Sequence, residues 1–187
     1  TCAITTDNDL YCWGYNGYYQ LGNDQTSGGS YAVPQPVSLP AARDAMGIAL
    51  GGYSSCAILD DESMYCWGND DDNRLNTEYN CDSSDSTNGC YNGNRDTPAP
   101  AIPPSGRSIV AAFAGRAHTC ALIDNGGLYC FGNNGVGQLG NGSNTSRSTP
   151  VQVIPSGVTH IAAGSNNNLS QSTSPQPDIP LNQNVTV

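Results

Sequence analysis

Residues 118–132 read His-Thr-Cys-Ala-Leu-Ile-Asp-Asn-Gly-Gly-Leu-Tyr-Cys-Phe-Gly, and this stretch decides the fold. Two short alternating runs flank residues 124–127, a cluster of turn-forming residues, so the pattern predicts a β-hairpin. Folding the stretch about this turn places Cys120 opposite Cys130. Because side chains alternate along a strand, both cysteines belong to the same face. A disulfide between the two strands of the hairpin is therefore geometrically natural.

The chain contains three copies of this hairpin, each with one cysteine on each strand. The second cysteine of each copy lies in the sequence Tyr-Cys-Trp-Gly or Tyr-Cys-Phe-Gly. After the second copy comes an Asp-, Ser- and Asn-rich segment that carries a fourth pair of cysteines, and we expect this pair to close an inserted loop near residues 70–95. The four expected disulfides join Cys2 to Cys12, Cys56 to Cys66, Cys81 to Cys90 and Cys120 to Cys130.

Each hairpin is followed by further features that recur. In the third copy a glycine-rich loop (132–140) leads to a proline-bearing strand (149–151) and then to a small apolar strand (161–164). Proline cannot donate to a ladder, which favours an edge position for the strand that contains it. A unit of about 50 residues thus has four strands. The loop of the second copy departs from this pattern, since residues 68–77 read Gly-Asn-Asp-Asp-Asp-Asn-Arg-Leu-Asn-Thr.

This repeat resembles the regulator-of-chromosome-condensation repeat family, whose units form β-propeller blades. The resemblance implies a fold more than a function, because propellers host unrelated activities. The best-known member exchanges guanine nucleotide on a small GTPase and contacts chromatin, and we carry no exchange residues over to this acidic, cysteine-paired chain. The residues that carry the resemblance are 118–122, 128–132, 134–140, Thr149 with Pro150, and 161–164.

We therefore predict an all-β array of antiparallel four-stranded propeller-type blades, with about three repeats stapled by disulfides. The array spans residues 1–168, with repeats at 1–54, 55–118 and 119–168. Residues 169–187 are polar and contain prolines, and we expect them to form an extended tail.

Composition excludes several classes of function. Six basic residues stand against 16 acidic ones, and a net charge of −10 argues against binding to nucleic acid. No window approaches the roughly 18 apolar residues that a membrane span needs. Zinc sites use shorter cysteine spacings than those found here, so disulfides, and with them an oxidising compartment, are the better interpretation. We expect a secreted or cell-surface protein.

Four sequons agree with that compartment, although each asparagine can equally be an unmodified loop residue. The candidate glycosylation sites are Asn141, Asn144, Asn168 and Asn184.

The two borders of the array are complementary. The chain starts within a hairpin, and its repeats end on an apolar strand without one. Closed propellers have four to eight blades, so the chain is interpreted as a fragment of a longer propeller, as a ring closed with another copy, or as a strand donor to a neighbour. For the last case the expected assembly residues are Thr1, Cys2, Ala3 and Ile4 at one border and His160, Ile161, Ala162 and Ala163 at the other.

We expect no enzymatic activity, no cofactor and no metal. His118 and His160 complete no catalytic triad, and the position of His118 before the hairpin favours a structural role. The acidic stretches 69–73 and 82–88 offer oxygen atoms to calcium but do not match the EF-hand pattern, so a solvated loop is preferred.

Eight of the ten tyrosines fall into two groups. Tyr11, Tyr65 and Tyr129 recur within the hairpins and are expected to pack between blades. Loop tyrosines can instead anchor a partner. The leading hypothesis is a self-assembling structural glycoprotein, a filament or coat of copies of this chain; the alternative is an extracellular recognition module that binds a protein or a glycan through its loops. The loop tyrosines are Tyr15, Tyr18, Tyr19, Tyr79 and Tyr91.

Overall fold

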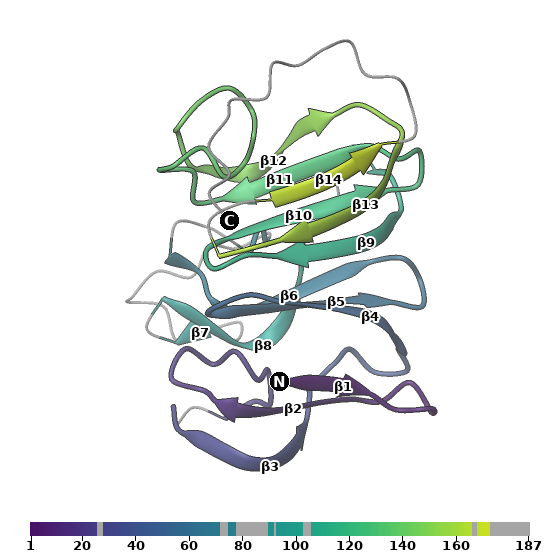
Figure 1. The fold of residues 1–187 in the computed structure, drawn as a ribbon. Coiled ribbons are helices and arrows are strands. Elements are labelled where there is room, and N and C mark those ends of the chain that lie inside the picture. Colours follow the sequence, from purple (N-terminus) through teal and green to yellow (C-terminus); the bar gives the residue numbers. More distant parts are fainter. Residues whose placement is uncertain are drawn as a thin grey trace.

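The structure is a computed structural model that describes residues 1–25, 28–71, 75–77, 90–91, 93–102, 106–165 and 168–172. The regular elements in these ranges are β-strands arranged in antiparallel sheets, as the sequence predicted. Figure 1 shows the first three sheets one above another in chain order, from the N-terminal sheet at the bottom, with β13 and β14 drawn across the strands of the third sheet.

The sheets follow one another along the chain. The first has the order β1 (Cys2–Ile4), β2 (Leu10–Tyr15), β3 (Ser30–Pro36). The second has the order β4 (Ala45–Leu50), β5 (Ser54–Leu59), β6 (Met64–Asn69), β8 (Asn94–Pro100), β7 (Cys90–Tyr91). The third has the order β9 (Ile109–Ala114), β10 (His118–Ile123), β11 (Leu128–Gly132), β12 (Arg147–Ile154). The fourth pairs β13 (Val158–Ala163) with β14 (Asn168–Ser172).

The three cysteine hairpins are confirmed, and so are their disulfides. In each hairpin the two cysteines stand directly opposite each other in the strand register, with their Cα atoms 4.1 Å apart. The fourth predicted pair is described in part: Cys90 is disulfide-bonded, whereas Cys81 lies outside the described residues. The proline-bearing strands β3 and β12 lie at sheet edges as expected. In the second sheet the proline-bearing strand is β8, and it is not at the edge, because β7 pairs with the part of β8 that precedes its prolines.

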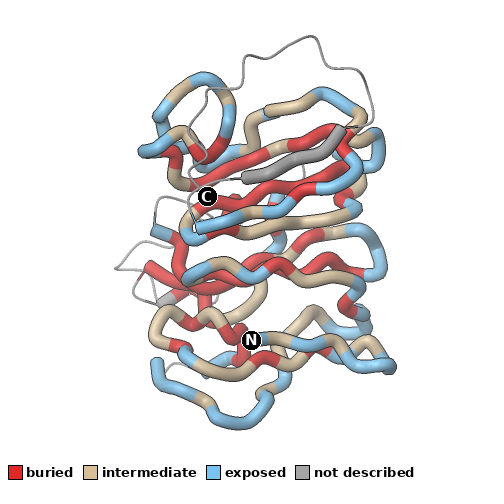
Figure 2. The backbone as a smooth tube through the Cα atoms, in the orientation of Figure 1, coloured by how far each residue is buried: buried red, intermediate tan, exposed pale blue. Residues whose placement is uncertain are grey.

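The sheets are out of phase with the sequence repeats. Each complete sheet takes its first strand, β4 or β9, from the end of the preceding repeat and pairs it with the hairpin that follows. Three apolar clusters fill the spaces between successive sheets. Figure 2 shows the buried residues running along strands through the middle of the stack, with exposed residues on β3 and on the loops. Every repeat is therefore tied to the next by both hydrogen bonds and packing.

The loop after each hairpin keeps one hydrogen bond in all three repeats, including the second, where residues 72–74 are outside the described residues. One buried side chain, Asn16, Asp70 or Asn134, accepts a hydrogen bond from the backbone N–H of the leucine five residues later, at 2.9, 3.2 and 2.9 Å. The residue after that leucine has positive φ, and in the second repeat it is Asn76 in place of glycine. Asparagine tolerates this conformation better than most residues. The hydrogen bond to the leucine and the positive φ after it are thus kept although the sequence of the second loop differs.

The glycine that ends each hairpin motif is required by the backbone. Gly14, Gly68 and Gly132 have φ values of +110°, +102° and +105°, and each sits where the register to the outer strand shifts. Such bulges favour glycine, because other residues are strained at these angles.

The C-terminal border differs from the expectation. β14 pairs with β13, with Ala163 opposite Asn168, so the strand pairing continues to Ser172 and the extended tail does not begin at residue 169. Residues 173–187 lie outside the described residues. β14 also occupies the edge of β13 that a neighbour's β1 would need, so residues 160–163 do not offer the free edge that strand donation requires. Strand β14 was not predicted, because the short apolar run 161–164 does not indicate that another strand follows it.

We predict that Gly68→Ala lowers the free energy of unfolding by about 3 kcal/mol or more, because the new Cβ is strained at positive φ and meets backbone atoms. That Cβ would lie 2.6 Å from the carbonyl oxygen of Tyr53 and 2.9 Å from the Cα of Ser54. Denaturant unfolding measures the effect. Gly29→Ala is the matched control, since its Cβ meets nothing within 4 Å, and equal stability of the two variants would contradict the prediction.

Asn134 supports a second prediction. Besides accepting from Leu139, it donates to the carbonyl oxygens of Ser143 and Thr145 at 2.8 and 3.1 Å. Asn134→Ala should lower the free energy of unfolding by about 2–4 kcal/mol, because buried backbone groups lose their partners. Asn134→Asp keeps the acceptor for the Leu139 N–H, as Asp70 does in the second repeat, but sets a carboxylate against the carbonyl oxygens of Ser143 and Thr145. It should therefore also lower the stability, while the Leu139 amide stays protected. Hydrogen exchange at the Leu139 amide distinguishes the two variants, and unchanged protection in Asn134→Ala would disprove this role.

Candidate functional site

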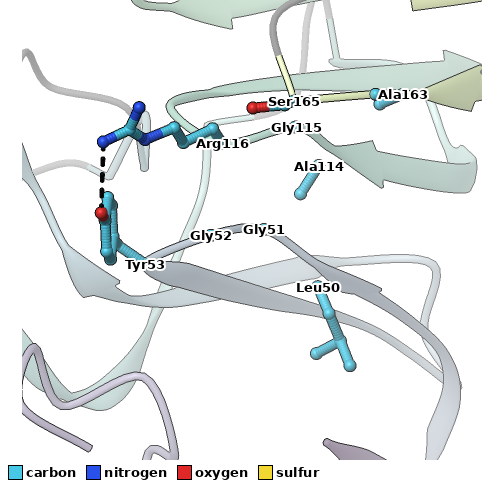
Figure 3. Close-up of a pocket in the computed structure, with 10 residues that line it drawn as sticks. Leu50, Gly51, Gly52, Tyr53, Ala114, Gly115, Arg116, Ala163 and Ser165 are labelled. Carbon is cyan, nitrogen blue, oxygen red and sulfur yellow. Dashed lines mark hydrogen bonds between the residues drawn. The ribbon is translucent and has the colours of Figure 1, made fainter. Parts of the chain in front are cut away.

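Three equivalent turns meet at one face of the stack and line a cavity of about 440 Å³. Each turn follows the first strand of a sheet, and each has a glycine after a small or aliphatic residue. Figure 3 shows the turns side by side, with Tyr53 and Arg116 across the opening from Ala114 and Leu50. The lining residues are Leu50, Gly51, Gly52 and Tyr53 after β4, Ala114, Gly115 and Arg116 after β9, and Ala163, Gly164 and Ser165 after β13.

Backbone hydrogen bonds join the turns across the sheets. The N–H of Gly52 donates to the carbonyl of Gly115 at 3.2 Å, and the N–H of Arg116 donates to the carbonyl of Ser165 at 3.0 Å. A Cβ on Gly51 would lie 2.6 Å from the oxygen of Gly115, so this close approach needs glycine. The turns form one continuous rim as a result.

His118 supports this rim from beneath. It is buried at the start of β10, and a Cβ on Gly115 would collide with its ring. The structural, hydrogen-bonding role expected for His118 stays a prediction, and the structure adds that its ring packs against the turn at Gly115. His160 is exposed on β13 and contacts its neighbour Thr159, so the two histidines belong to different surroundings.

One side of the cavity carries a row of aromatic rings and a guanidinium group. Arg116 donates to the Tyr53 hydroxyl at 3.3 Å, and its Cζ lies 5.6 Å from the centroid of that ring. Tyr53 in turn contacts Tyr18, with ring centroids 4.8 Å apart, and Tyr18 contacts Tyr15 edge-on at 6.2 Å. The row thus runs from the first sheet to the third.

A second cavity of about 220 Å³ extends the site toward the first sheet. It shares Leu50, Gly51 and Gly52 with the first cavity and is bounded on its far side by Tyr15. No carboxylate is among the described residues that line either cavity, although the chain carries a net charge of −10. The two cavities form one groove, with Arg116 among the residues that line the first cavity and Thr1, whose N-terminal ammonium donates to the carbonyl of Trp13, among those that line the second. We refer to them together as the rim groove.

The carboxyl group with a raised pKa lies away from the groove. The carboxyl group with a raised pKa, Asp96, is shifted by burial and by the nearby Asp24 carboxylate, and it lies on β8 outside the groove. Within the described ranges, no group of three or more His, Cys, Asp or Glu side chains is placed to hold a metal ion. In the same ranges there is no helix with the length and apolarity to cross a bilayer.

The loop tyrosines are distributed in three ways. Tyr15 and Tyr18 are brought together beside the groove, whereas Tyr19 is buried and therefore unavailable to a partner, contrary to expectation. Tyr91 lies on β7, and Tyr79 is outside the described residues. Two hairpin tyrosines pack against the clusters between sheets, as predicted; these are Tyr65 and Tyr129.

The sequons occupy different settings. Asn144 is exposed, whereas the side-chain oxygen of Asn141 accepts hydrogen bonds from Ser143 and Asn134. Asn168 lies on β14, and Asn184 is outside the described residues.

The acidic stretches considered for calcium are described only in part. Asp70 is used internally by its loop, as shown above, and Asp71 is exposed and accepts a hydrogen bond from Asn69 at 2.9 Å. Asp72 and residues 82–88 are outside the described residues.

Tyr53 and Arg116 were not among the residues singled out from the sequence. Tyr53 and Arg116 lie near the ends of different repeats and are 63 positions apart, so no local sequence pattern connects them. The signal that could have found them is the alignment of the turns after the apolar strands, which places Gly51, Gly115 and Gly164 in register and marks the residues beside them as neighbours.

Known proteins similar to this chain span much longer sequences. The probable E3 ubiquitin-protein ligase HERC4 of Rattus norvegicus is 31% identical over an alignment of 172 residues, which covers 87% of this chain and 14% of HERC4. The mitochondrial RCC1 domain-containing protein RUG3 of Arabidopsis thaliana is 31% identical over 154 residues, which are 82% of this chain and 32% of RUG3. The chain therefore spans less than a third of each of these relatives.

Solved structures share the fold at lower identity. Prp20p of Saccharomyces cerevisiae matches with a TM-score of 0.78 and 20% identity, covering 94% of this chain and 42% of that one. Human WBSCR16 matches with a TM-score of 0.75 and 22% identity, covering 92% and 42%.

Two family models describe the repeat itself. The model of the regulator of chromosome condensation (RCC1) repeat matches residues 7–58 and 125–170. A second model of that repeat matches residues 47–74 and 109–138, which include the first strands of the second and third sheets. The hairpins, the glycine bulges and the sheet order agree with these matches, and the chain belongs to the regulator of chromosome condensation repeat family.

Proposed function

We propose that this chain is a protein-recognition module, without enzymatic activity of its own, and that its partner binds in the rim groove. The observation that carries the proposal is the row of Tyr15, Tyr18, Tyr53 and Arg116 along a groove whose described lining residues include no carboxylate. Tyrosine and arginine are the residue types enriched at energetic hot spots of protein interfaces. Their mutual contacts hold them in place before a partner arrives, which lowers the entropy cost of binding.

The composition of the groove supports a polypeptide partner. Its floor is backbone and small apolar side chains, with Leu50 40% exposed. Tyr15, 59% exposed, stands at its far end. Apolar surface that a partner can cover, flanked by rigid aromatic rings, is the arrangement expected of an interface core with a polar rim.

Proteins of the same fold are consistent with this class of partner. One solved structure concerns the binding of Prp20p to Gsp1p and histones, and another contains Kap60 bound to yeast Prp20. These partners belong to those proteins, and the identity of about a fifth supports the shared fold alone. The ligase activity in the name of HERC4 is not proposed here, because this chain spans 14% of that protein.

Self-assembly by strand donation has less support than recognition. The edge of β13 that it needs is paired with β14. A second copy of the chain remains one of the proteins that the groove can be tested against.

We further propose that the protein works in an oxidising compartment. Three bridges between opposed strands support this, because such disulfides persist where thiol reductants are scarce. The exposed sequon at Asn144 is compatible with a secreted glycoprotein.

Selection of a displayed random-peptide library against the oxidised protein tests the recognition proposal. Enriched peptides should lose about tenfold or more in affinity for Leu50→Gln and for Tyr53→Ala, because both changes remove covered interface area. Val33→Gln is the matched control, since Val33 is 62% exposed on the outer strand β3 of the first sheet and lines neither cavity.

The recognition proposal is rejected if no peptide is enriched above an unrelated propeller, or if enriched peptides bind both groove variants as well as the original chain. Sedimentation across a range of concentrations tests the second copy as partner. Concentration-dependent association that Leu50→Gln abolishes would identify the chain itself as the occupant.

The compartment proposal predicts that the chain, made behind a secretory leader, carries fully oxidised cysteines. Intact mass measured before and after reduction counts two hydrogens for each bridge. Material with free thiols at Cys56 and Cys66 that is nonetheless folded would contradict the proposal, because these two cysteines are buried within the clusters between sheets.

A further inference from the structure

We infer that the rim groove takes an acidic side chain from within an extended protein segment, and that the Arg116 guanidinium meets its carboxylate. This inference rests on the proposed recognition function and names the chemistry of the partner. It follows from how Arg116 is held, from the charges around it, and from the way the groove continues past it.

Arg116 is exposed yet fixed in position. Its Nη2 donates to the hydroxyl of Tyr53, and the guanidinium lies over the Tyr53 ring, which Tyr18 also contacts. A guanidinium has five N–H donors in a planar fork that matches a carboxylate. The Tyr53 contact uses one edge of the group and leaves donors for a ligand. A side chain held in this way loses little freedom when it binds.

The charges of the surroundings favour a single carboxylate. Arg43 and Arg107 are each paired with aspartates of the chain, whereas Arg116 is paired with an aromatic ring. No carboxylate lines the described part of the groove, so nothing there competes for the guanidinium. The net charge of −10 repels a segment with many acidic residues. One carboxylate placed at Arg116 is therefore the ligand that fits.

The residue next to the acid should be apolar. The floor beside Arg116 consists of Ala114, Ala163 and Leu50, one from each of the three turns. Their side chains offer apolar contact to such a residue.

The backbone of the groove argues for an internal acidic residue and against a chain terminus. Capture of a terminal carboxylate commonly uses free backbone N–H groups. Here the N–H groups of Gly52 and Arg116 already donate to the carbonyls of Gly115 and Ser165. The groove also continues from the first cavity into the second, toward Tyr15, so a segment can pass through it.

Three focused peptide libraries test the inference. Each has random positions around a fixed central residue, which is glutamate, glutamine or lysine. The original chain should bind the best glutamate peptides about tenfold to a hundredfold more tightly than their glutamine counterparts, as expected for a hydrogen bond to a charged group. Arg116→Gln should abolish this preference, and Arg116→Glu should favour the lysine library. Fluorescence polarisation with labelled peptides measures each affinity.

Arg147→Gln is the matched control, because Arg147 is exposed at the start of β12 and lines neither cavity. It should keep the preference for glutamate. Thermal unfolding of the Arg116 variants should match that of the original chain, so that a change in affinity reports the groove. Tyr53→Phe keeps the ring and loses the hydroxyl, and a partial loss of the glutamate preference is expected from it.

Several outcomes would overturn the inference while leaving the recognition function intact. If glutamate and glutamine peptides bind equally well and Leu50→Gln still lowers their affinity, the groove binds peptides without selecting for a charged side chain. Binding that requires a free C-terminal carboxylate, and is lost on amidation, shows a terminus as the ligand. If no library yields a binder, the recognition function itself fails.

Discussion

Packing of each sheet against the next holds this chain together, and Trp67 illustrates how. Its ring is fully buried, its Nε1 donates to the carbonyl of Gln20 at 3.0 Å, and Ser55 Oγ donates to that same oxygen at 2.8 Å. Gly22 lies so close that a Cβ would be 2.6 Å from the indole nitrogen. The loop of one repeat is thereby sealed onto the sheet of the next. A single sheet of this kind has no interior of its own, so the repeats stabilise one another.

The rim groove is a consequence of that stacking. Each repeat contributes one short turn, and none of these turns contains a site alone. Because successive sheets stack in register, the turns after β4, β9 and β13 come together and their backbones bond across the gaps. Side chains that differ between repeats then determine the chemistry of the groove. Tyr53 and Arg116 occur at turns whose counterparts carry other residues, so the chemistry is asymmetric although the scaffold is repetitive.

The predictions agreed with the structure where a feature depends on residues close together in the sequence. The hairpins and their disulfides were predictable, because alternation and turn residues act over a dozen positions. The loop of the second repeat was not, since Asp70 and Asn76 replace the residues that mark it elsewhere while keeping its hydrogen bond and positive φ. β14 was also missed: its strand is stabilised by pairing with β13, and the polar sequence gives no sign of it.

Local sequence alone determined the all-β class, the three stapled hairpins and the edge positions of β3 and β12, because each depends on residues that are neighbours along the chain. The same prediction was wrong for β8, which β7 covers. Tertiary structure decided where the sheets begin and end, that β13 has a partner, and which side chains share the groove. The reason is physical: a turn conformation or a cross-strand bridge is set by short-range geometry, whereas the meeting of Tyr18, Tyr53 and Arg116 depends on how whole sheets stack.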